Sequence, residues 1–191
     1  MHIADRVTQL PEYPFVTISR TIAAKKAQGI DVISFGIGDP DRETPGFILD
    51  ALDRGTRNTP NHRYPESEGL PEFRKSVTDW YERRFGVSLN PETEAISLIG
   101  AKEGIGHAAL AFLNPGDMAI MPDPAYPVYD VGTIFAGGVS YKVPMHEEAG
   151  WLVDLDDIPS DVAKDAKLLW LNYPNNPTGG VAPLEYFNKV V

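Results

Sequence analysis

Hydrophobic residues occur in this chain in two alternating patterns. Short segments rich in apolar residues and ending before Gly, Pro or Asn lie near residues 95, 118, 139 and 167. Those at 118 and 167 contain continuous apolar runs, which are typical of strands buried on both faces. Between these runs, apolar residues recur three or four positions apart, as in the stripe Ile105, Ala108, Ala109 and Phe112; this is the spacing of an amphipathic helix. The alternation predicts an α/β fold with a mainly parallel sheet and helices on both faces.

The first part of the chain has a less regular pattern. Residues 1–16 are predicted to form an extended arm, and residues 18–28 a helix. Residues 32–36 are predicted as a short strand that runs into a glycine-rich turn. Two more helices are expected, one after Pro45 and one from Pro71, and the apolar spacing of the second predicts a face turned toward the core.

Composition narrows the classes of partner. The 191 residues include 42% apolar residues, enough to bury a core, and the net charge of −10 disfavours binding to nucleic acid or to an anionic membrane. There is no cysteine, and the four histidines are scattered without a metal-ligand spacing, so no metal site is predicted. The start of the chain lacks a secretion signal and no apolar run approaches about 20 residues, which favours the cytoplasm.

The most informative stretch is residues 168–180, Leu-Leu-Trp-Leu-Asn-Tyr-Pro-Asn-Asn-Pro-Thr-Gly-Gly. A continuous apolar run gives way abruptly to Asn, Pro and Gly, which indicates a buried strand that leaves the sheet and turns. Open α/β sheets bind their ligands at such strand ends. By composition alone, Asn175 and Asn176 could simply tolerate unusual turn dihedral angles.

Two other predicted strand ends carry candidate chemistry. After the apolar run at 95–99, Gly100-Ala101-Lys102 turns into a helix, which places backbone amides and the positive end of a helix dipole at an anion site. After the run that begins near residue 118, the segment 122–129 is rich in proline and tyrosine and contains Tyr126. These rings could equally cover the edge of the core.

Taken together, these stretches resemble the class I/II aminotransferases, which are pyridoxal phosphate (PLP) enzymes of fold type I. The Asn-Pro-Thr-Gly sequence at 176–179 matches the signature of that family. The resemblance implies that Asn176 hydrogen-bonds the phenolic oxygen of PLP, that Ala101 and Lys102 bind its phosphate, and that Tyr126 stacks on its ring. It further implies that Tyr64, in the polar loop 61–69, reaches the PLP phosphate of a partner subunit, and therefore a homodimer.

The same resemblance implies a substrate site and a substrate class. It assigns Tyr13 and Gly38 to the substrate, together with Lys102, Tyr126 and Asn176. The sequences Ile-Gly-Ala-Lys-Glu-Gly-Ile and Pro-Asp-Pro-Ala-Tyr-Pro-Val-Tyr are most similar to the LL-diaminopimelate aminotransferase branch. The implied reaction is transamination between an amino acid, such as LL-diaminopimelate, and a 2-oxo acid, such as 2-oxoglutarate, in lysine biosynthesis.

The resemblance also implies a division of the chain and a missing part. Residues 1–44 are expected to form an amino-terminal arm and small-domain segment, and residues 45–191 the first part of the PLP-binding large domain. In the family, the lysine that forms an imine with PLP lies downstream of Asn-Pro-Thr-Gly, so no catalytic residue is assigned here and an amino-terminal fragment is expected. The alternatives are a PLP-dependent lyase or synthase, a PLP-sensing transcriptional regulator, or a fragment with no activity of its own.

Overall fold

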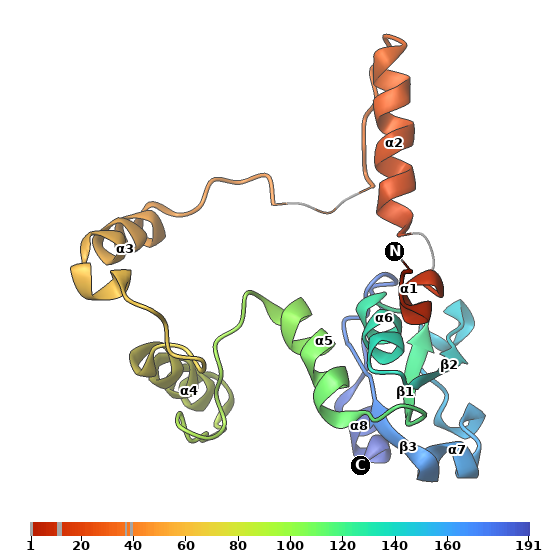
Figure 1. Cartoon of the computed structure of the whole chain (residues 1–191). Helices are drawn as coiled ribbons and strands as arrows, with labels where there is room; N and C mark the ends of the chain where they lie inside the picture. The colour runs from red at the N-terminus through yellow and green to blue at the C-terminus, as the bar shows by residue number, and fades with distance from the viewer. Residues whose placement is uncertain (1, 11–12, 37, 39) are drawn as a thin grey trace. The chain divides into compact units, whose positions relative to one another are not determined.

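The computed structural model describes residues 2–10, 13–36, 38 and 40–191 of the chain (Figure 1). The chain divides into two compact units. We call the first, formed by Met1–Leu10 and Leu98–Val191, the strand unit, and the second, Pro11–Ser97, the helical unit. Within the described residues, no helix is both long enough and apolar enough to cross a membrane.

The strand unit is built on a parallel sheet of three strands in the order β2-β1-β3 (Figure 1). The strands are β1 (Met118–Asp123), β2 (Val139–Pro144) and β3 (Ala166–Leu169). Met118 lies opposite Val139 on one side and opposite Ala166 on the other, so β1 is paired along both edges. Three of the four predicted strands and their parallel direction are therefore confirmed.

Alternate residues of β1 enter two different cores, because successive side chains of a strand point to opposite faces. Ala119 and Met121 pack with helix α5 (Ala101–Phe112) and helix α6 (Val128–Phe135). Ile120 packs on the other face with a cluster that includes Tyr186 of helix α8 (Leu184–Val190) and Val162 of helix α7 (Ser160–Asp165). The sheet therefore has helices on both faces, as the hydrophobic pattern predicts.

Short elements complete the strand unit. The 3₁₀ helices η2 (Glu147–Ala149) and η3 (Leu155–Asp157) lie between β2 and α7, and the Asp154 carboxylate caps η3 by accepting a hydrogen bond from the Asp156 amide. Helix α1 (Asp5–Thr8) contacts α6. The Asp130 carboxylate of α6 accepts hydrogen bonds from Ser140 and Lys142 of β2, which ties this helix to the edge of the sheet.

The helical unit contains four elements: α2 (Pro14–Ala27), α3 (Gly46–Arg57), η1 (Thr59–His62) and α4 (Pro71–Phe85). The side-chain amide of Asn61 donates to the Gly55 carbonyl at 2.8 Å and so folds η1 back on the end of α3. The guanidinium of Arg74 on α4 is buried and donates to the carbonyl oxygens of Gly69 and Pro91. This arginine joins the loops on either side of its helix.

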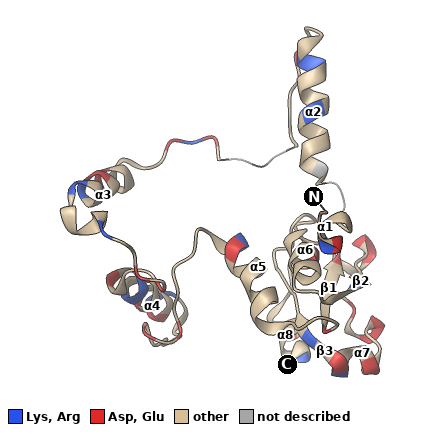
Figure 2. Cartoon of the chain, viewed as in Figure 1, with Lys and Arg blue, Asp and Glu red and all other residues tan. Residues whose placement is uncertain are grey.

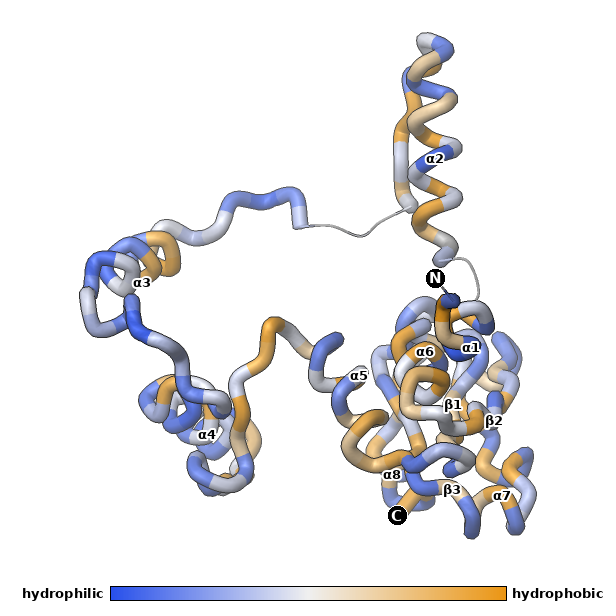
Figure 3. The backbone as a smooth tube through the Cα atoms, in the orientation of Figure 1, coloured by the Kyte–Doolittle hydropathy of each residue, from blue (hydrophilic) through white to orange (hydrophobic). Residues whose placement is uncertain are grey.

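The strands predicted at 32–36 and 95–99 are wrong. Neither segment is paired with a neighbouring strand among the described residues, and a strand exists only through hydrogen bonds to a neighbour. The segment before α5 is extended and apolar (Figure 3), and its Ile99 is 96% exposed. Hydrophobicity alone therefore marks this segment as fit for burial without showing what would cover it.

Two further expectations for the first part of the chain are also wrong. In place of an extended arm over 1–16, the structure has α1 at Asp5–Thr8, and α2 already begins at Pro14. The apolar face of α4 is not turned toward a core, since Phe73 and Trp80 are exposed and the buried side chains of that helix are Arg74 and Thr78. Polar anchoring, which hydrophobic spacing does not report, sets the buried side of this helix.

Candidate functional site

The loops that follow β1 and β3 lie at the same edge of the sheet, because parallel strands present their carboxyl ends together. The loop after β1, residues 124–127, leads into α6, and the loop after β3, residues 170–183, leads into α8. The Asn175 side-chain amide donates to the Pro124 carbonyl at 3.4 Å, so the two loops are in direct contact. The strand ends on which sequence reasoning placed the site thus meet in space.

The loop after β3 closes on itself around the two asparagines. The backbone nitrogen of Asn175 donates to the Gly180 carbonyl at 2.8 Å, and the backbone nitrogen of Gly179 donates to the backbone carbonyl of Asn175 at 2.7 Å. Asn175 is 4% exposed, whereas its neighbour Asn176 is exposed. The closed turn therefore directs one asparagine inward and leaves the other accessible to a ligand.

Tyr126 is held by a row of aromatic rings. Its ring meets that of Tyr129 edge to face, with centroids 6.1 Å apart, and Tyr129 in turn stacks on Trp170 at 5.0 Å with an interplanar angle of 11°. Tyr129 is buried, and this burial raises the pKa of its phenol. The half-buried Tyr126 ring therefore rests on a rigid neutral support that spans α6 and the exit of β3.

The start of α5 lies beside Tyr126. The ammonium group of Lys102 is 5.6 Å from the centroid of the Tyr126 ring, which is a cation–π distance. Gly100 precedes the helix at φ +106°, a conformation that L side chains rarely adopt. The Glu103 carboxylate accepts a hydrogen bond from the Ile99 amide and fixes the charged first turn of α5 (Figure 2).

This donor set suits a flat, phosphorylated aromatic ligand. A helix N-terminus with a nearby ammonium group attracts an anion, the Tyr126 ring offers an aromatic contact, and the exposed Asn176 amide can donate to an anionic oxygen. Pyridoxal phosphate has an anionic phosphate, a flat aromatic ring and a phenolic oxygen, one for each of these protein groups, so the residues present fit it. In the part of the chain that the structure describes, no group of three or more acidic or histidine side chains is arranged to hold a metal ion.

The remaining predicted site residues belong to the helical unit. Tyr64 is 97% exposed in the loop between η1 and α4. Tyr13 immediately precedes α2 and packs against Phe15 at a centroid distance of 5.3 Å. Gly38 is exposed, and a side chain added there would meet no atom within 4 Å. The structure thus brings Lys102 and Tyr126 together. The ligand-binding roles of these two residues, like those of the other predicted site residues, stay predictions.

Sequence reasoning missed the part played by Asn175 and Trp170. Asn175 joins the two loops, and Trp170 supports the ring row beneath Tyr126. Trp170 lies in the apolar run and Asn175 directly precedes the Asn-Pro-Thr-Gly motif, but the residue type alone does not show which neighbour each side chain contacts.

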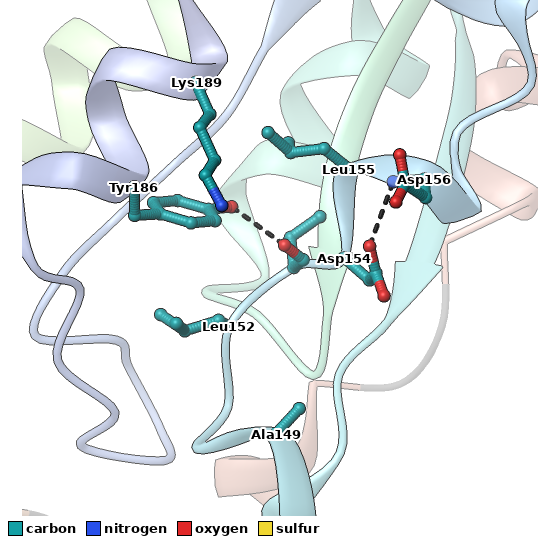
Figure 4. A pocket seen from close by; sticks show the side chains of 8 residues that line it. Ala149, Leu152, Asp154, Leu155, Asp156, Tyr186 and Lys189 are labelled. Atoms are coloured by element: carbon teal, nitrogen blue, oxygen red, sulfur yellow. Dashed lines mark hydrogen bonds between the residues drawn. The ribbon is translucent and has the colours of Figure 1, made fainter.

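A second hollow in the strand unit shares no residue with this site. It is a cavity of about 510 Å³ between α8 and the η2–η3 segment (Figure 4), where the Tyr186 hydroxyl donates to the Val153 carbonyl. Its charged lining residues, Asp154, Asp156 and Lys189, are all exposed. The buried Tyr186 hydroxyl already donates its proton to the Val153 carbonyl and the charged lining groups are exposed, so this hollow offers little that would select a ligand.

Comparison with known proteins agrees with the geometry. Residues 30–191 match the family model "Aminotransferase class I and II". The chain is 54% identical over 189 residues to an LL-diaminopimelate aminotransferase of Dehalococcoides mccartyi, a match that includes 99% of this chain and 49% of the relative. It is 55% identical over 188 residues to an LL-diaminopimelate aminotransferase of Aquifex aeolicus, and that match includes 98% of this chain and 49% of the relative. Apo-BacF from Bacillus subtilis superposes with a TM-score of 0.91 at 37% identity, over 100% of this chain and 49% of that one. The chain therefore spans about half the length of the relatives that it matches.

Proposed function

The chain belongs to the class I and II aminotransferases, and from this premise we propose that it forms the part of a PLP-dependent enzyme that grips the cofactor. The reaction is the transfer of an amino group between an amino acid and a 2-oxo acid. The observation that carries this proposal is the meeting of α5, Tyr126 and the loop after β3 at one edge of the sheet. We assign no catalytic lysine to these residues.

Each side of the cofactor has a protein group suited to it. The first turn of α5, at Ala101 and Lys102, binds the phosphate through backbone amides and the helix dipole. Tyr126 stacks on the ring and keeps its plane fixed, because its own ring is braced by Tyr129. Asn176 donates its amide to the phenolic oxygen of the ring, and Tyr64 reaches the phosphate bound in a partner subunit.

When bound, PLP supplies a conjugated ring that takes up the electron pair left at the substrate carbon after a proton departs. The chain's own contribution is to position and to polarise. A neutral amide at Asn176 stabilises negative charge on the phenolic oxygen without adding a proton of its own. The Lys102 ammonium group balances the phosphate and lies near enough to the Tyr126 ring to favour a substrate carboxylate there. Tyr13 and the backbone at Gly38 complete the substrate side.

LL-diaminopimelate is the amino donor that we propose, with 2-oxoglutarate as the acceptor. The support is the name carried by relatives that are more than half identical over nearly the whole of this chain. This substrate places the enzyme in lysine biosynthesis, and so in the cytoplasm. A site that takes a residue from each of two subunits needs at least a dimer, and we propose a homodimer on that ground.

The test is a product assay on the protein made from the complete reading frame. The protein is supplied with PLP, LL-diaminopimelate and 2-oxoglutarate, and glutamate release is measured. We expect glutamate to form, and Asn176→Ala to lower kcat/KM by about 10²-fold, the scale of a lost polar contact to developing charge. In a parallel assay with PLP and a thioether amino acid such as cystathionine, release of a thiol, pyruvate and ammonia, together with no glutamate from LL-diaminopimelate, would identify a lyase and overturn the proposal.

The 191-residue chain provides a second measurement. With PLP alone it should show no absorbance band that borohydride fixes to the protein, because we assign it no imine-forming lysine. A stoichiometric band fixed by borohydride would show that this assignment is wrong. Lys102→Met distinguishes the two cases, because the band would disappear in this variant only if Lys102 formed the imine.

A further inference from the structure

The buried amide of Asn175 bridges two loops that are far apart in the sequence. Its Nδ2 atom lies 3.4 Å from the carbonyl oxygen of Pro124, 51 positions away, and 3.0 Å from Thr178 Oγ1 in its own loop. The side chain is almost completely buried, so water does not compete for these contacts. The amide therefore connects the exit of β1 to the exit of β3.

The chemistry of the neighbours fixes the orientation of this amide. The carbonyl oxygen of Pro124 can only accept a hydrogen bond, so the nitrogen of Asn175, and not the oxygen, must face it. The Oδ1 atom is buried and has no donor among the described protein atoms. A carboxylate of the same shape would place an acceptor against the Pro124 carbonyl and would lose the bridge.

Both ends of the bridge adjoin residues proposed to contact the cofactor. Pro124 lies two positions before Tyr126, and Asn175 directly precedes Asn176. The backbone of Asn175 is held as well, by the hydrogen bonds that join it to Gly179 and Gly180. The contact to Pro124 thus sets the distance between a loop that supplies a stacking ring and a loop that supplies an amide donor.

We infer that Asn175 is a positioning residue, which holds Tyr126 and Asn176 at the separation that one PLP ring requires. This inference rests on the proposed function and adds a residue that does not itself touch the ring. Removing the bridge allows the loop after β1 to move relative to the loop after β3. Tyr126 and Asn176 then no longer contact the cofactor in one fixed arrangement, so the affinity for PLP and the orientation of its ring both change.

The decisive substitution is Asn175→Asp, which keeps the shape and removes the donor. Asn175→Ala is the second variant, because it removes the donor without placing a charge in a buried position. The matched control is Asn172→Asp, in the same loop, since the Asn172 amide donates at 3.2 Å to Pro174 within that loop and makes no bridge to the loop after β1. All three are made in the protein from the complete reading frame.

Three measurements are compared: the dissociation constant for PLP, the visible circular dichroism of bound PLP, and deuterium uptake by residues 124–129 without cofactor. We expect both Asn175 variants to raise the dissociation constant by about tenfold, alter the dichroism and speed deuterium uptake. Asn172→Asp should stay within about twofold of the parent protein in affinity. If Asn175→Asp does not fold, Asn175→Ala decides.

The possible failures are distinct. If the parent protein binds PLP and both Asn175 variants match the Asn172 control in affinity and dichroism, the inference is overturned while the proposed function stands. The inference also fails if deuterium uptake alone increases, because Asn175 would then only support the local fold. If the parent protein does not bind PLP, the proposed function is overturned, and the inference with it.

Discussion

Gly179 and Gly180 are adjacent in the loop after β3, and alanine should destabilise the protein at each position for a different reason. Gly179 has φ +75°, and a Cβ added there would meet nothing within 4 Å. At Gly180, an added Cβ would lie 2.7 Å from Trp151 Cβ and 2.9 Å from the Gly150 carbonyl oxygen. Gly179→Ala strains the backbone although its side chain meets no atom, whereas Gly180→Ala places a methyl group where other atoms already lie.

The expected magnitudes follow from these two causes. Gly179→Ala should cost about 1–2 kcal/mol, the penalty of a left-handed conformation for an L residue. Gly180→Ala should cost about 1–3 kcal/mol from overpacking. Relief of that clash requires Gly180 to move, which also weakens the hydrogen bond from the Asn175 nitrogen to its carbonyl and adds about 1 kcal/mol. Gly180→Ala is therefore expected to be the more damaging change.

The assay is urea unfolding of the 191-residue chain, followed by far-ultraviolet circular dichroism for the parent and for each variant. Gly179→Asn is the matched control, because asparagine tolerates the left-handed region better than alanine does. It should recover part of the stability that Gly179→Ala loses. No such recovery is expected from Gly180→Asn, since any Cβ there meets the same two atoms.

Two results would refute this reasoning. One is a free energy of unfolding for Gly180→Ala within about 0.5 kcal/mol of the parent, the range of ordinary surface substitutions. The other is a larger loss for Gly179→Asn than for Gly179→Ala. The first outcome would mean that the loop does not pack against residues 150–151, and the second that Gly179 does not hold a left-handed conformation.

Three further predictions concern the cores and the buried polar groups. Met121→Ala, at a buried position of β1, should lower the free energy of unfolding by about 2–5 kcal/mol in urea titrations. Arg74→Met removes the donor to two half-buried carbonyls and should cost about 1–3 kcal/mol, and Arg74→Lys should cost less, as differential scanning calorimetry can show. Burial, with a smaller contribution from the neighbouring Tyr173 phenol, raises the pKa of Tyr186 above its usual 10.0. The stability that the neutral Tyr186 contributes is thus complete below pH 10.0 and is lost as the pH rises from there toward the higher folded-state pKa. The advantage of the parent over Tyr186→Phe in urea titrations should therefore be constant at lower pH and shrink above about pH 10.

The sheet could be predicted because β1 is apolar on both faces and each of its edges finds a partner. Ala119, Ile120 and Met121 are all buried, and a run of this kind has few alternatives to a central parallel strand. The segment 95–99 is equally apolar, yet it has no strand beside it among the described residues. Pairing is a property of two segments, so hydrophobicity along one segment predicts the need for a partner and not its presence.

The place of the candidate site could be predicted from the sequence, whereas its contacts with a ligand stay predictions. The rings after β1 and the polar turn after β3 both lie at the carboxyl edge of the parallel sheet, where strand ends meet. The glycine before α5 follows a segment that is not a strand, and α5 reaches the site through Lys102. The distance between Lys102 and Tyr126 agrees with this. Tyr64 and Tyr13 depend instead on how the helical unit meets a site, which no local pattern in the chain specifies.

The pair Asn175-Asn176 shows why a buried supporting residue of a site is harder to predict from the sequence than an exposed residue that binds the ligand. A side chain exposed to a ligand must have the right chemistry, and a sequence motif records that chemistry directly. A buried amide must instead find acceptors, because an unpaired one costs free energy, and the Asn175 amide finds the Pro124 carbonyl on a loop 51 positions away. An asparagine in a turn can also be satisfied by solvent or by its own loop, as Asn172 is, so two adjacent asparagines do not by themselves predict the contact to Pro124. That contact follows from the fold, because the parallel strands β1 and β3 bring the two loops to the same edge of the sheet.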